Sequence, residues 1–165
     1  MAETDDRVDV VEYYDASLDH YFMTGSAAEI AALDGGAPAG WKRTGYVLPA
    51  LAFERAGTQE LCRYYIPPAQ GDSHFFSASR AECDDVARKF PSFTSEGPTR
   101  IFMALPDPAS GKCASGALAV YRIWNRRADS NHRYTTSRAI RDHMVALGGA
   151  AEGFGPDAVA MCAPQ

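Results

Sequence analysis

The feature that most constrains this chain is a motif that recurs three times along it. Each copy has a histidine, then aromatic and hydroxyl residues, then a serine that leads a helix-like segment: LDHYFMTGSAAEI at 18–30, DSHFFSASRAEC at 72–83 and DSNHRYTTSRAI at 129–140. Such recurrence is typical of repeat proteins, whose units are too small to bury both of their faces alone. We therefore expect the 165 residues to form one domain of three repeats, at about 10–55, 61–107 and 119–162.

Each repeat predicts the same order of elements, which is strand, strand, helix, strand. An aromatic-rich run predicts the first strand, and the histidine segment predicts a short second strand. A helix is expected after each serine. Ser26 and Glu29 have the spacing of a capping box, in which each side chain binds the other residue's backbone amide, and Ser79 and Glu82 repeat it. The expected fold class is α+β, with a pseudo-threefold arrangement that places helices outside and brings strands together near the centre.

Four cysteines are spread through the chain without a C-x-x-C pair, which excludes a zinc ribbon and a thioredoxin-type motif. Their even number is compatible with two disulfides and also with four free thiols. Cys62 leads a predicted strand, and Cys83 lies on the helix of the same repeat. Cys113 precedes the third repeat, and Cys162 closes it. We predict the disulfides Cys62–Cys83 and Cys113–Cys162, which favour an oxidising compartment.

Location and charge limit the partners. The opening segment MAETDDRVDV lacks the basic and apolar regions of a signal peptide, so a signal would have to be absent from this sequence. We expect a secreted, periplasmic or cell-surface protein. No stretch of about 18 apolar residues is present, and no membrane span is expected. The net charge of −5 argues against nucleic acid as a partner.

The repeated unit also resembles a known family. The family's pattern is Asp-His-[Phe/Tyr]-[Phe/Tyr]-Thr-[Thr/Ser], then a helix of the type A-E-x-x-A-L, then Gly-Trp and Glu-Gly. This chain carries DHYFMT followed by GW, and SNHRYTTSRAIRDHMVALGGAAEGFG. It departs from the pattern at Thr44, where glutamate is usual, and at Phe93, where tryptophan is usual. Over about residues 10–162 the chain resembles a repeat family of unknown function in secreted bacterial and fungal proteins, often appended to extracellular hydrolases. The resemblance implies secretion and surface binding, but no activity.

The three histidines have a structural interpretation and two functional ones. An aspartate precedes each histidine at a different interval: Asp19 before His20, Asp72 before His74 and Asp129 before His132. A catalytic pair needs one fixed geometry, so the changing interval weakens a shared acid–base role. We expect buried imidazoles that bond the backbone or the carboxylate of their own repeat. The alternatives are a zinc site made by all three rings and three small ligand pockets beside exposed aromatic residues. No cofactor is expected.

The aromatic residues suggest a carbohydrate site. A ring covers the apolar face of a sugar, while amides and carboxylates bridge neighbouring hydroxyls. The third repeat combines these groups most fully, and the other two carry partial sets. The candidate ligand-binding residues are Trp124, Asn125, Asp129, Asn131, His132 and Tyr134, with Tyr14, Asp19 and His20 in the first repeat and Tyr65, Asp72 and His74 in the second.

We therefore expect a non-catalytic, lectin-like binding module whose partner is a polysaccharide or other glycan. The first alternative is a hydrolase that uses a His/Asp pair. However, the sequence contains no G-x-S-x-G elbow and no H-E-x-x-H motif. The second alternative is a module that binds another protein of the cell envelope, such as an inhibitor or immunity protein. Several equivalent sites would favour the first function, and one deep polar pocket would favour an enzyme.

Overall fold

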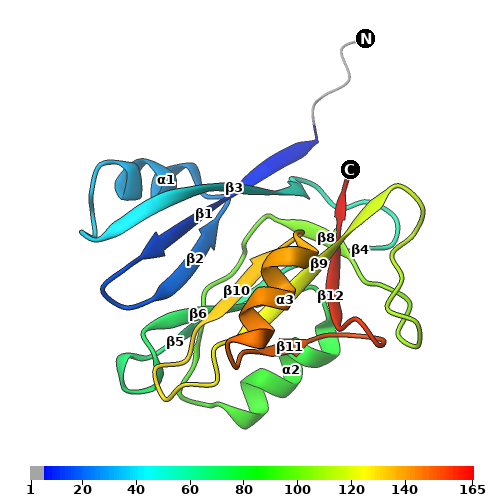
Figure 1. The fold of residues 1–165 in the computed structure, drawn as a ribbon. Helices are drawn as coiled ribbons and strands as arrows, with labels where there is room; N and C mark the ends of the chain where they lie inside the picture. The colour runs from blue at the N-terminus through cyan, green and yellow to red at the C-terminus, as the bar shows by residue number, and fades with distance from the viewer. Residues whose placement is uncertain (1–5) are drawn as a thin grey trace.

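The computed structural model describes residues 6–165, in which antiparallel strands form a β-rich sandwich with 41% strand and 19% helix (Figure 1). The elements in chain order are β1 (Arg7–Asp15), β2 (His20–Thr24), α1 (Ala27–Asp34), β3 (Trp41–Leu51), β4 (Thr58–Glu60), β5 (Cys62–Ile66), η1 (Pro68–Gln70), β6 (Ser73–Ser77), α2 (Arg80–Lys89), β7 (Thr94–Ser95), β8 (Phe102–Ala104), β9 (Ala117–Trp124), β10 (His132–Thr135), α3 (Arg138–Ala146), β11 (Ala150–Glu152) and β12 (Val159–Pro164). Within this described part, a large sheet follows the path β10-β9-β12-β8-β3-β1-β2, with β11 beside β9 and β4 beside β8. A small sheet has the order β6-β5-β7.

The expected α+β fold with a pseudo-threefold arrangement is wrong, because the strands form an antiparallel sandwich of two unequal sheets. The closing segment of the second expected repeat shows why. It splits into β7, which pairs with β5, and β8, which crosses to the large sheet and pairs with β3, β4 and β12. Pro98 lies between these two strands and cannot donate a ladder hydrogen bond. Long-range pairing decides which sheet a short strand joins, and a local pattern does not specify it.

The local elements around each histidine nevertheless form where the motif predicts them. β2, β6 and β10 contain the three histidines, and α1, α2 and α3 follow them. In each helix the serine at the N-cap accepts a hydrogen bond from the amide three residues later: Ser26 from Glu29 at 3.4 Å, Ser79 from Glu82 at 3.2 Å and Ser137 from Ile140 at 3.2 Å. This contact satisfies one of the free amides of the first helical turn.

The other half of the predicted capping boxes is wrong. The amide of each cap serine donates to a hydroxyl two residues earlier, at 3.0 Å in each case: Ser26 to Thr24, Ser79 to Ser77 and Ser137 to Thr135. The hydroxyl at the end of the histidine strand therefore fills the role that a capping-box glutamate would have. This leaves the carboxylates of Glu29 and Glu82 free to bind arginines on neighbouring strands.

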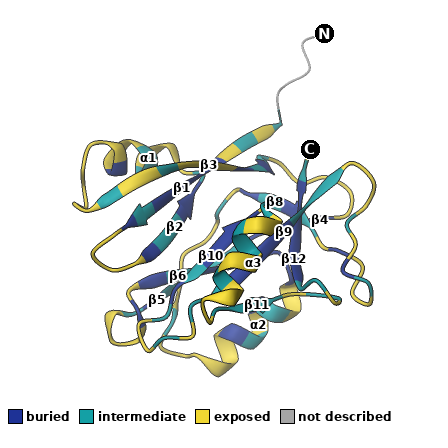
Figure 2. Cartoon of the chain, in the orientation of Figure 1, coloured by how far each residue is buried: buried dark blue, intermediate teal, exposed yellow. Residues whose placement is uncertain are grey.

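The main core lies between the two sheets, where strands are buried while the outer faces of the helices are exposed (Figure 2). Its buried members are Val10, Met23, Leu48, Ala50, Leu61, Phe76, Ala78, Ile101, Met103, Val120, Tyr134, Ala160, Met161 and Ala163. One polar link crosses this core. The Tyr134 hydroxyl donates to the carbonyl of Phe76 at 2.9 Å and accepts from its amide at 2.7 Å. Burying a hydroxyl is tolerated here because both of its hydrogen-bonding roles are met.

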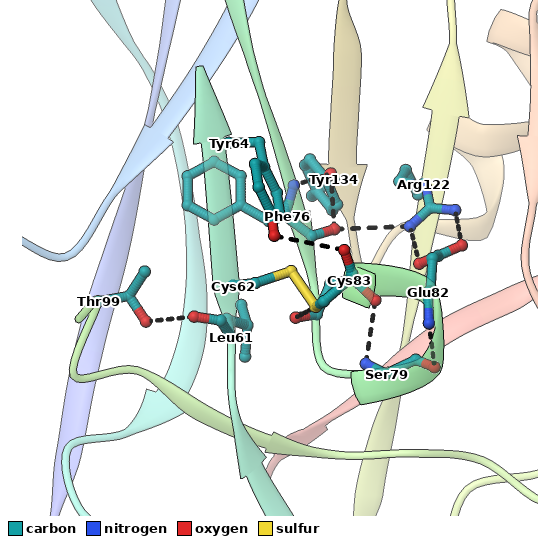
Figure 3. The surroundings of a disulfide bond; sticks show 11 residues. Leu61, Cys62, Tyr64, Phe76, Ser79, Glu82, Cys83, Thr99, Arg122 and Tyr134 are labelled. Atoms are coloured by element: carbon teal, nitrogen blue, oxygen red, sulfur yellow. Dashed lines mark hydrogen bonds and ion pairs between the residues drawn. A yellow bond between two sulfur atoms is a disulfide. The ribbon is translucent and has the colours of Figure 1, made fainter. Parts of the chain in front are cut away.

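Both predicted disulfides are present. Cys62–Cys83 joins β5 to α2 across 21 residues, and Cys113–Cys162 joins the loop before β9 to β12 across 49 residues. Figure 3 shows the first of them beside Tyr64 and Glu82, with the Tyr64 hydroxyl donating to the carbonyl of Cys83 at 3.3 Å. The described chain contains no free cysteine. Two disulfides are compatible with an extracellular or secreted location.

Candidate functional site

Two clefts flank the small sheet, and we call them cleft A and cleft B. Cleft A lies between α1, β2 and β3 on one side and β5 and β6 on the other, with a volume of about 430 Å³. It is lined by Asp15, Leu18, Tyr21, Phe22, Glu29, Ala32, Leu33, Ala37, Pro38, Ala39, Trp41, Arg63, Asp72, Ser73 and His74. Cleft B lies between α2 and β6 on one side and β9, β10 and β11 on the other, with a volume of about 580 Å³. It is lined by Ile66, Gln70, Phe75, Glu82, Asp85, Val86, Lys89, Phe90, Phe93, Arg122, Trp124, Arg127, Ala128, Ser130, His132 and Glu152.

Arg63 on β5 forms the charged floor of cleft A. Its two terminal nitrogens donate to the oxygens of Glu29 on α1 at 2.7 and 2.8 Å, which is a bidentate pair. Its Nε donates to Glu96 Oε1 at 3.0 Å, and His74 Nε2 lies 2.9 Å from the same oxygen. The Arg63 side chain is only 14% exposed. The three partners therefore hold the guanidinium in one orientation.

Arg122 on β9 forms the floor of cleft B with the same kinds of partner. Its terminal nitrogens donate to Glu82 on α2 at 2.7 and 2.8 Å, and its Nε donates to Glu152 Oε1 at 3.0 Å. His132 Nε2 lies 3.3 Å from that oxygen. Figure 3 shows Arg122 and Glu82 pointing toward one another next to the Cys62–Cys83 disulfide. Since the Arg122 side chain is 4% exposed and that of Glu82 is 37% exposed, the guanidinium is the buried member of this ion pair and needs all of its partners.

Three carboxylates of the floors, those of Glu29, Glu82 and Glu152, are ionised near neutral pH. Hydrogen bonds from Arg63 hold the pKa of Glu29 below its usual value. Burial alone would raise the pKa of Glu82 and of Glu152. Hydrogen bonds outweigh it and lower both values, from Arg122 to Glu82 and from His132 and Arg122 to Glu152. None of these three groups is poised to release a proton at neutral pH.

His74 is neutral at the edge of cleft A. Burial, together with the positive charge of Arg63, lowers the pKa of His74 to about 4, although Glu96 and Glu29 oppose this shift. A neutral ring has one N–H donor and one acceptor nitrogen, and Nε2 lies between two groups, 2.9 Å from Glu96 Oε1 and 3.3 Å from a terminal nitrogen of Arg63.

Aromatic side chains form a wall in each cleft. In cleft A the rings of Phe22 and Trp41 meet edge to face, with centroids 6.0 Å apart. In cleft B the rings of Phe90 and Phe93 are stacked, with centroids 4.8 Å apart and planes within 11°. Phe90 is 42% exposed, so a face of this stack is available to a ligand. Trp124 lines the same cleft and is fixed by its indole nitrogen, which donates to Ser130 Oγ at 2.9 Å.

The candidate residues of the third expected repeat divide into two groups. Trp124 and His132 line cleft B. Asn131 is buried and binds the backbone of Tyr21, accepting from its amide at 2.8 Å and donating to its carbonyl at 2.9 Å. Asn125 donates to the Asp129 carbonyl and accepts from the Asn131 amide, so it shapes the loop. Tyr134, whose hydroxyl is taken by Phe76, belongs to the core.

The candidate residues of the other two repeats are brought together in pairs. The Tyr14 hydroxyl donates to Asp19 at 2.8 Å, and the Tyr65 hydroxyl donates to Asp72. Asp72 and His74 line cleft A, whereas Asp19 lines neither cleft. The members of each pair are close in the sequence. Only the packing of β5 and β6 against α1 places Asp72 of the Tyr65–Asp72 pair in a cleft.

His20 is buried and its partner comes from a distant part of the chain. Its Nε2 lies 3.2 Å from the backbone carbonyl of Asp129, as the expected bond to the backbone requires, and 3.2 Å from the Asp129 side chain, which belongs to another expected repeat. Arg127 donates to both Asp129 and Asp19, so it holds the Asp129 carboxylate next to His20. The three histidines thus bind separate carboxylates, and no group of three potential metal ligands occurs in the part of the chain that the structure describes. The geometry does not support the alternative of a shared zinc site.

A third arginine–glutamate ion pair has no open cleft beside it. Glu12 on β1 forms a bidentate pair with Arg133 on β10 at 2.8 and 2.9 Å, and it accepts a hydrogen bond from Thr44 at 2.8 Å. The guanidinium stacks on the ring of Tyr21 with 4.0 Å between its central carbon and the ring centroid. The hollow beside this pair measures only about 20 Å³, so it is too small for a sugar.

Sequence reasoning missed the arginines and the residues that wall the clefts. The sequence assigned Glu29 and Glu82 to helix caps. From the first turn of their helices they instead bind Arg63 on β5 and Arg122 on β9. The missed residues are Arg63 and Arg122, which occupy the second position of β5 and the sixth of β9, together with Trp41, Phe90 and Phe93. Aligning the first strands of the repeats places Arg63 and Arg122 at one position, and Glu12 at the same position in the first. That shared position was the available signal.

Comparisons with known proteins give a family and nothing more specific. The family model described as "Domain of unknown function (DUF5648)" matches residues 1–103. No curated protein matches, and no solved structure matches. None of the described helices has the length and apolar character that crossing a membrane requires.

Proposed function

We propose that this chain, which belongs to the family described as a domain of unknown function (DUF5648), is a non-catalytic glycan-binding module. Membership of that family supplies no activity, so the proposal rests on the geometry of clefts A and B. One observation carries the proposal. Each cleft combines a wall of aromatic rings with a floor of ion-paired arginine and glutamate. Sugar recognition uses this combination, since rings cover the C–H face and charged planar groups bind hydroxyls.

The floors are organised before any ligand binds. Arg63 and Arg122 each have both terminal nitrogens and Nε engaged, so their partner carboxylates keep fixed positions. A rigid site loses little conformational entropy on binding, which supports useful affinity from a small contact area. Two such clefts on one chain would also gain by avidity on a polysaccharide that presents many copies of one unit.

The charge state of the clefts argues against the hydrolase alternative. A glycosidase needs one carboxyl that stays protonated to act as general acid, beside a second one that is ionised. In cleft B the pKa values of Glu82 and Glu152 are both lowered, and both side chains bind the same arginine. A pair of ionised carboxylates held by a guanidinium binds hydroxyl protons well and donates none.

A secreted or cell-surface location fits this function. Cys62–Cys83 braces α2 against β5, next to the Arg122–Glu82 pair of cleft B. A disulfide in that place keeps its cleft rigid outside the cell, where thiols are oxidised.

Glycan-array screening of the purified protein, followed by calorimetry with the best ligand, tests the proposal. Replacing the stacked and exposed ring in Phe90→Ala should weaken binding by about tenfold, which corresponds to the loss of one aromatic contact. The control is Phe53→Ala, because Phe53 is 59% exposed and lines neither cleft. Equal losses in both variants, or no glycan binding while an envelope protein binds with high affinity, would contradict the proposal.

A further inference from the structure

The two clefts differ in charge although their floors are alike. The lining of cleft A has three carboxylates, Asp15, Glu29 and Asp72, against one guanidinium, Arg63. The lining of cleft B has three carboxylates against three cationic groups, which are Lys89, Arg122 and Arg127. Cleft A therefore carries excess negative charge, whereas the charges that line cleft B balance.

Two of the cleft A carboxylates have no cationic partner within the described chain. Glu29 is neutralised by Arg63, but neither Asp15 nor Asp72 takes part in an ion pair there. Asp72 accepts a hydrogen bond from the Tyr65 hydroxyl and is otherwise exposed. An unpaired carboxylate on a concave surface raises the local concentration of cations.

Asp15 is an unusual member of this set because it is only 5% exposed. Its Oδ1 accepts hydrogen bonds from the amide and hydroxyl of Ser17 at 2.8 and 2.6 Å and from the Leu18 amide at 3.3 Å. The Ser17 hydroxyl lowers the pKa of Asp15, so the group is charged. Its Oδ2 has no hydrogen-bond partner among the described residues, and a Cβ at Gly40 would lie 2.6 Å from it. Gly40 therefore packs against this carboxylate where any side chain would collide with it, and the second oxygen of the buried charge has no hydrogen-bond partner among the described residues.

The aromatic wall of cleft A lies next to these charges. Trp41 pairs with Asp15 across the β1–β3 ladder, and Phe22 meets the Trp41 ring edge to face. A ligand that lies on this wall therefore has the Asp15 carboxylate beside it.

We infer that cleft A takes a cationic amino-sugar unit of a glycan, with its ammonium group facing the carboxylates of Asp15 and Asp72 and its apolar face on Trp41. The inference rests on the proposed glycan-binding function and adds the substrate class of one cleft. A charge-assisted hydrogen bond to an ammonium group is stronger than one to a neutral hydroxyl, so the unacetylated amine is preferred over its acetamide. Cleft B, with balanced charge, has no such preference.

Calorimetry on the whole protein tests this with two probes of equal length, a glucosamine oligosaccharide and an N-acetylglucosamine oligosaccharide, at a pH that protonates the free amine. We expect the glucosamine oligosaccharide to bind about tenfold more tightly, as one additional charged contact would give. Asp72→Asn, which retains an oxygen for the Tyr65 hydroxyl, should remove most of this preference by weakening binding of the glucosamine probe much more than binding of the acetylated probe. Asp84→Asn is the matched control, since Asp84 is exposed on α2 and lines neither cleft. Its preference should equal that of the wild type.

The outcomes separate this inference from the proposed function. If the acetylated probe binds as tightly as the glucosamine probe, or Asp72→Asn keeps the preference, the amino-sugar assignment is wrong while glycan binding stands. If a lysine-rich peptide displaces the glucosamine probe and binds more tightly, cleft A recognises a protein and the assignment is again wrong. If neither oligosaccharide nor any other glycan binds, both the assignment and the proposed function fail.

Discussion

At the scale of single residues, burial separates structural groups from ligand-binding ones. His20 is 1% exposed and the side chain of His132 is 10% exposed, whereas Phe90 is 42% exposed. Each of the three rings has a carboxylate near Nε2, whereas Nδ1 of His20 and of His132 is buried without a hydrogen-bond partner among the described residues. The histidines therefore join strands and loops, and the aromatic residues of the clefts remain for recognition.

His74 gives the protein a predictable loss of stability in mild acid. The pKa of its imidazole falls from 6.5 in the unfolded chain to about 4 in the fold, because the ring is buried beside Arg63. Between pH 6.5 and pH 4 the imidazole is protonated in the unfolded chain but remains neutral in the folded chain. The free energy of unfolding should therefore fall by about 3 kcal/mol as the pH drops through this range. Urea titrations across this range measure it. His74→Gln should show a much flatter dependence, and an equally steep one would contradict the assignment.

Replacing His132 tests the structural role directly. His132→Ala removes a partner of the partly buried Glu152 and should lower the free energy of unfolding by about 1 to 3 kcal/mol. Glycan affinity measured below the melting transition should change little. A variant that keeps its stability but loses a ligand or an activity would show that the imidazole is functional.

Replacing Trp124 should give the opposite pattern. The ring lines cleft B, and its indole nitrogen binds only the hydroxyl of Ser130. Trp124→Ala should weaken glycan binding by about tenfold, as expected for the loss of an aromatic contact, and shift the melting temperature less than His132→Ala does. Unchanged binding would remove Trp124 from the site.

At the scale of elements, ion pairs to largely buried arginines join each of two helices to a strand farther along the chain. α1 is joined to β5 through Glu29 and Arg63, and α2 is joined to β9 through Glu82 and Arg122. The glutamates can make these contacts because strand hydroxyls bind the cap amides in their place. Helix capping and interstrand packing are therefore coupled in this fold.

This coupling predicts the effect of losing one glutamate. Glu82→Ala deprives the buried Arg122 of its bidentate partner and should destabilise the fold by about 2 to 3 kcal/mol. In an Arg122→Met background the same change should cost much less, because no buried charge is left unpaired. Chemical denaturation of the single and double variants measures the coupling. Asp84→Ala on the same helix, which forms no ion pair in the described chain, is the control and should have little effect.

At the scale of the whole molecule, each disulfide joins a segment outside the strand ladders to a strand. Cys113–Cys162 ties a loop before β9 to β12, and Cys62–Cys83 ties α2 to the small sheet. In the loop-entropy description the longer loop gives the larger stabilisation, because closing it removes more freedom from the unfolded chain.

Removing each disulfide should therefore have unequal effects. Cys113→Ala with Cys162→Ala opens a loop of 49 residues and should cost about 4 kcal/mol, whereas Cys62→Ala with Cys83→Ala opens one of 21 residues and should cost about 3 kcal/mol. Thermal and urea unfolding of the two double variants gives the comparison. A larger loss for the 21-residue loop would show that native packing around α2 dominates over loop entropy.

The sequence by itself determined the local structure of this protein. The serines fixed where three helices begin, the histidine segments fixed three short strands, and the positions of the cysteines indicated both disulfides. The helices and strands depend on residues close in sequence, so a local pattern is sufficient to find them, and each disulfide joins cysteines that are at most 49 residues apart. The pairs Tyr14–Asp19 and Tyr65–Asp72 were likewise close enough along the chain to be expected together.

Only the tertiary structure decided which strands belong to the large sheet, which belong to the small sheet and where the clefts lie. β8 leaves its neighbour β7 to join the large sheet, His20 takes its carboxylate from Asp129, and Glu82 binds Arg122 on another strand. Each of these contacts joins residues that are distant in the sequence, and each was chosen among competing partners by packing, burial and charge together. Since the clefts are made of such contacts, their walls and floors could be recognised only after the chain had been assembled.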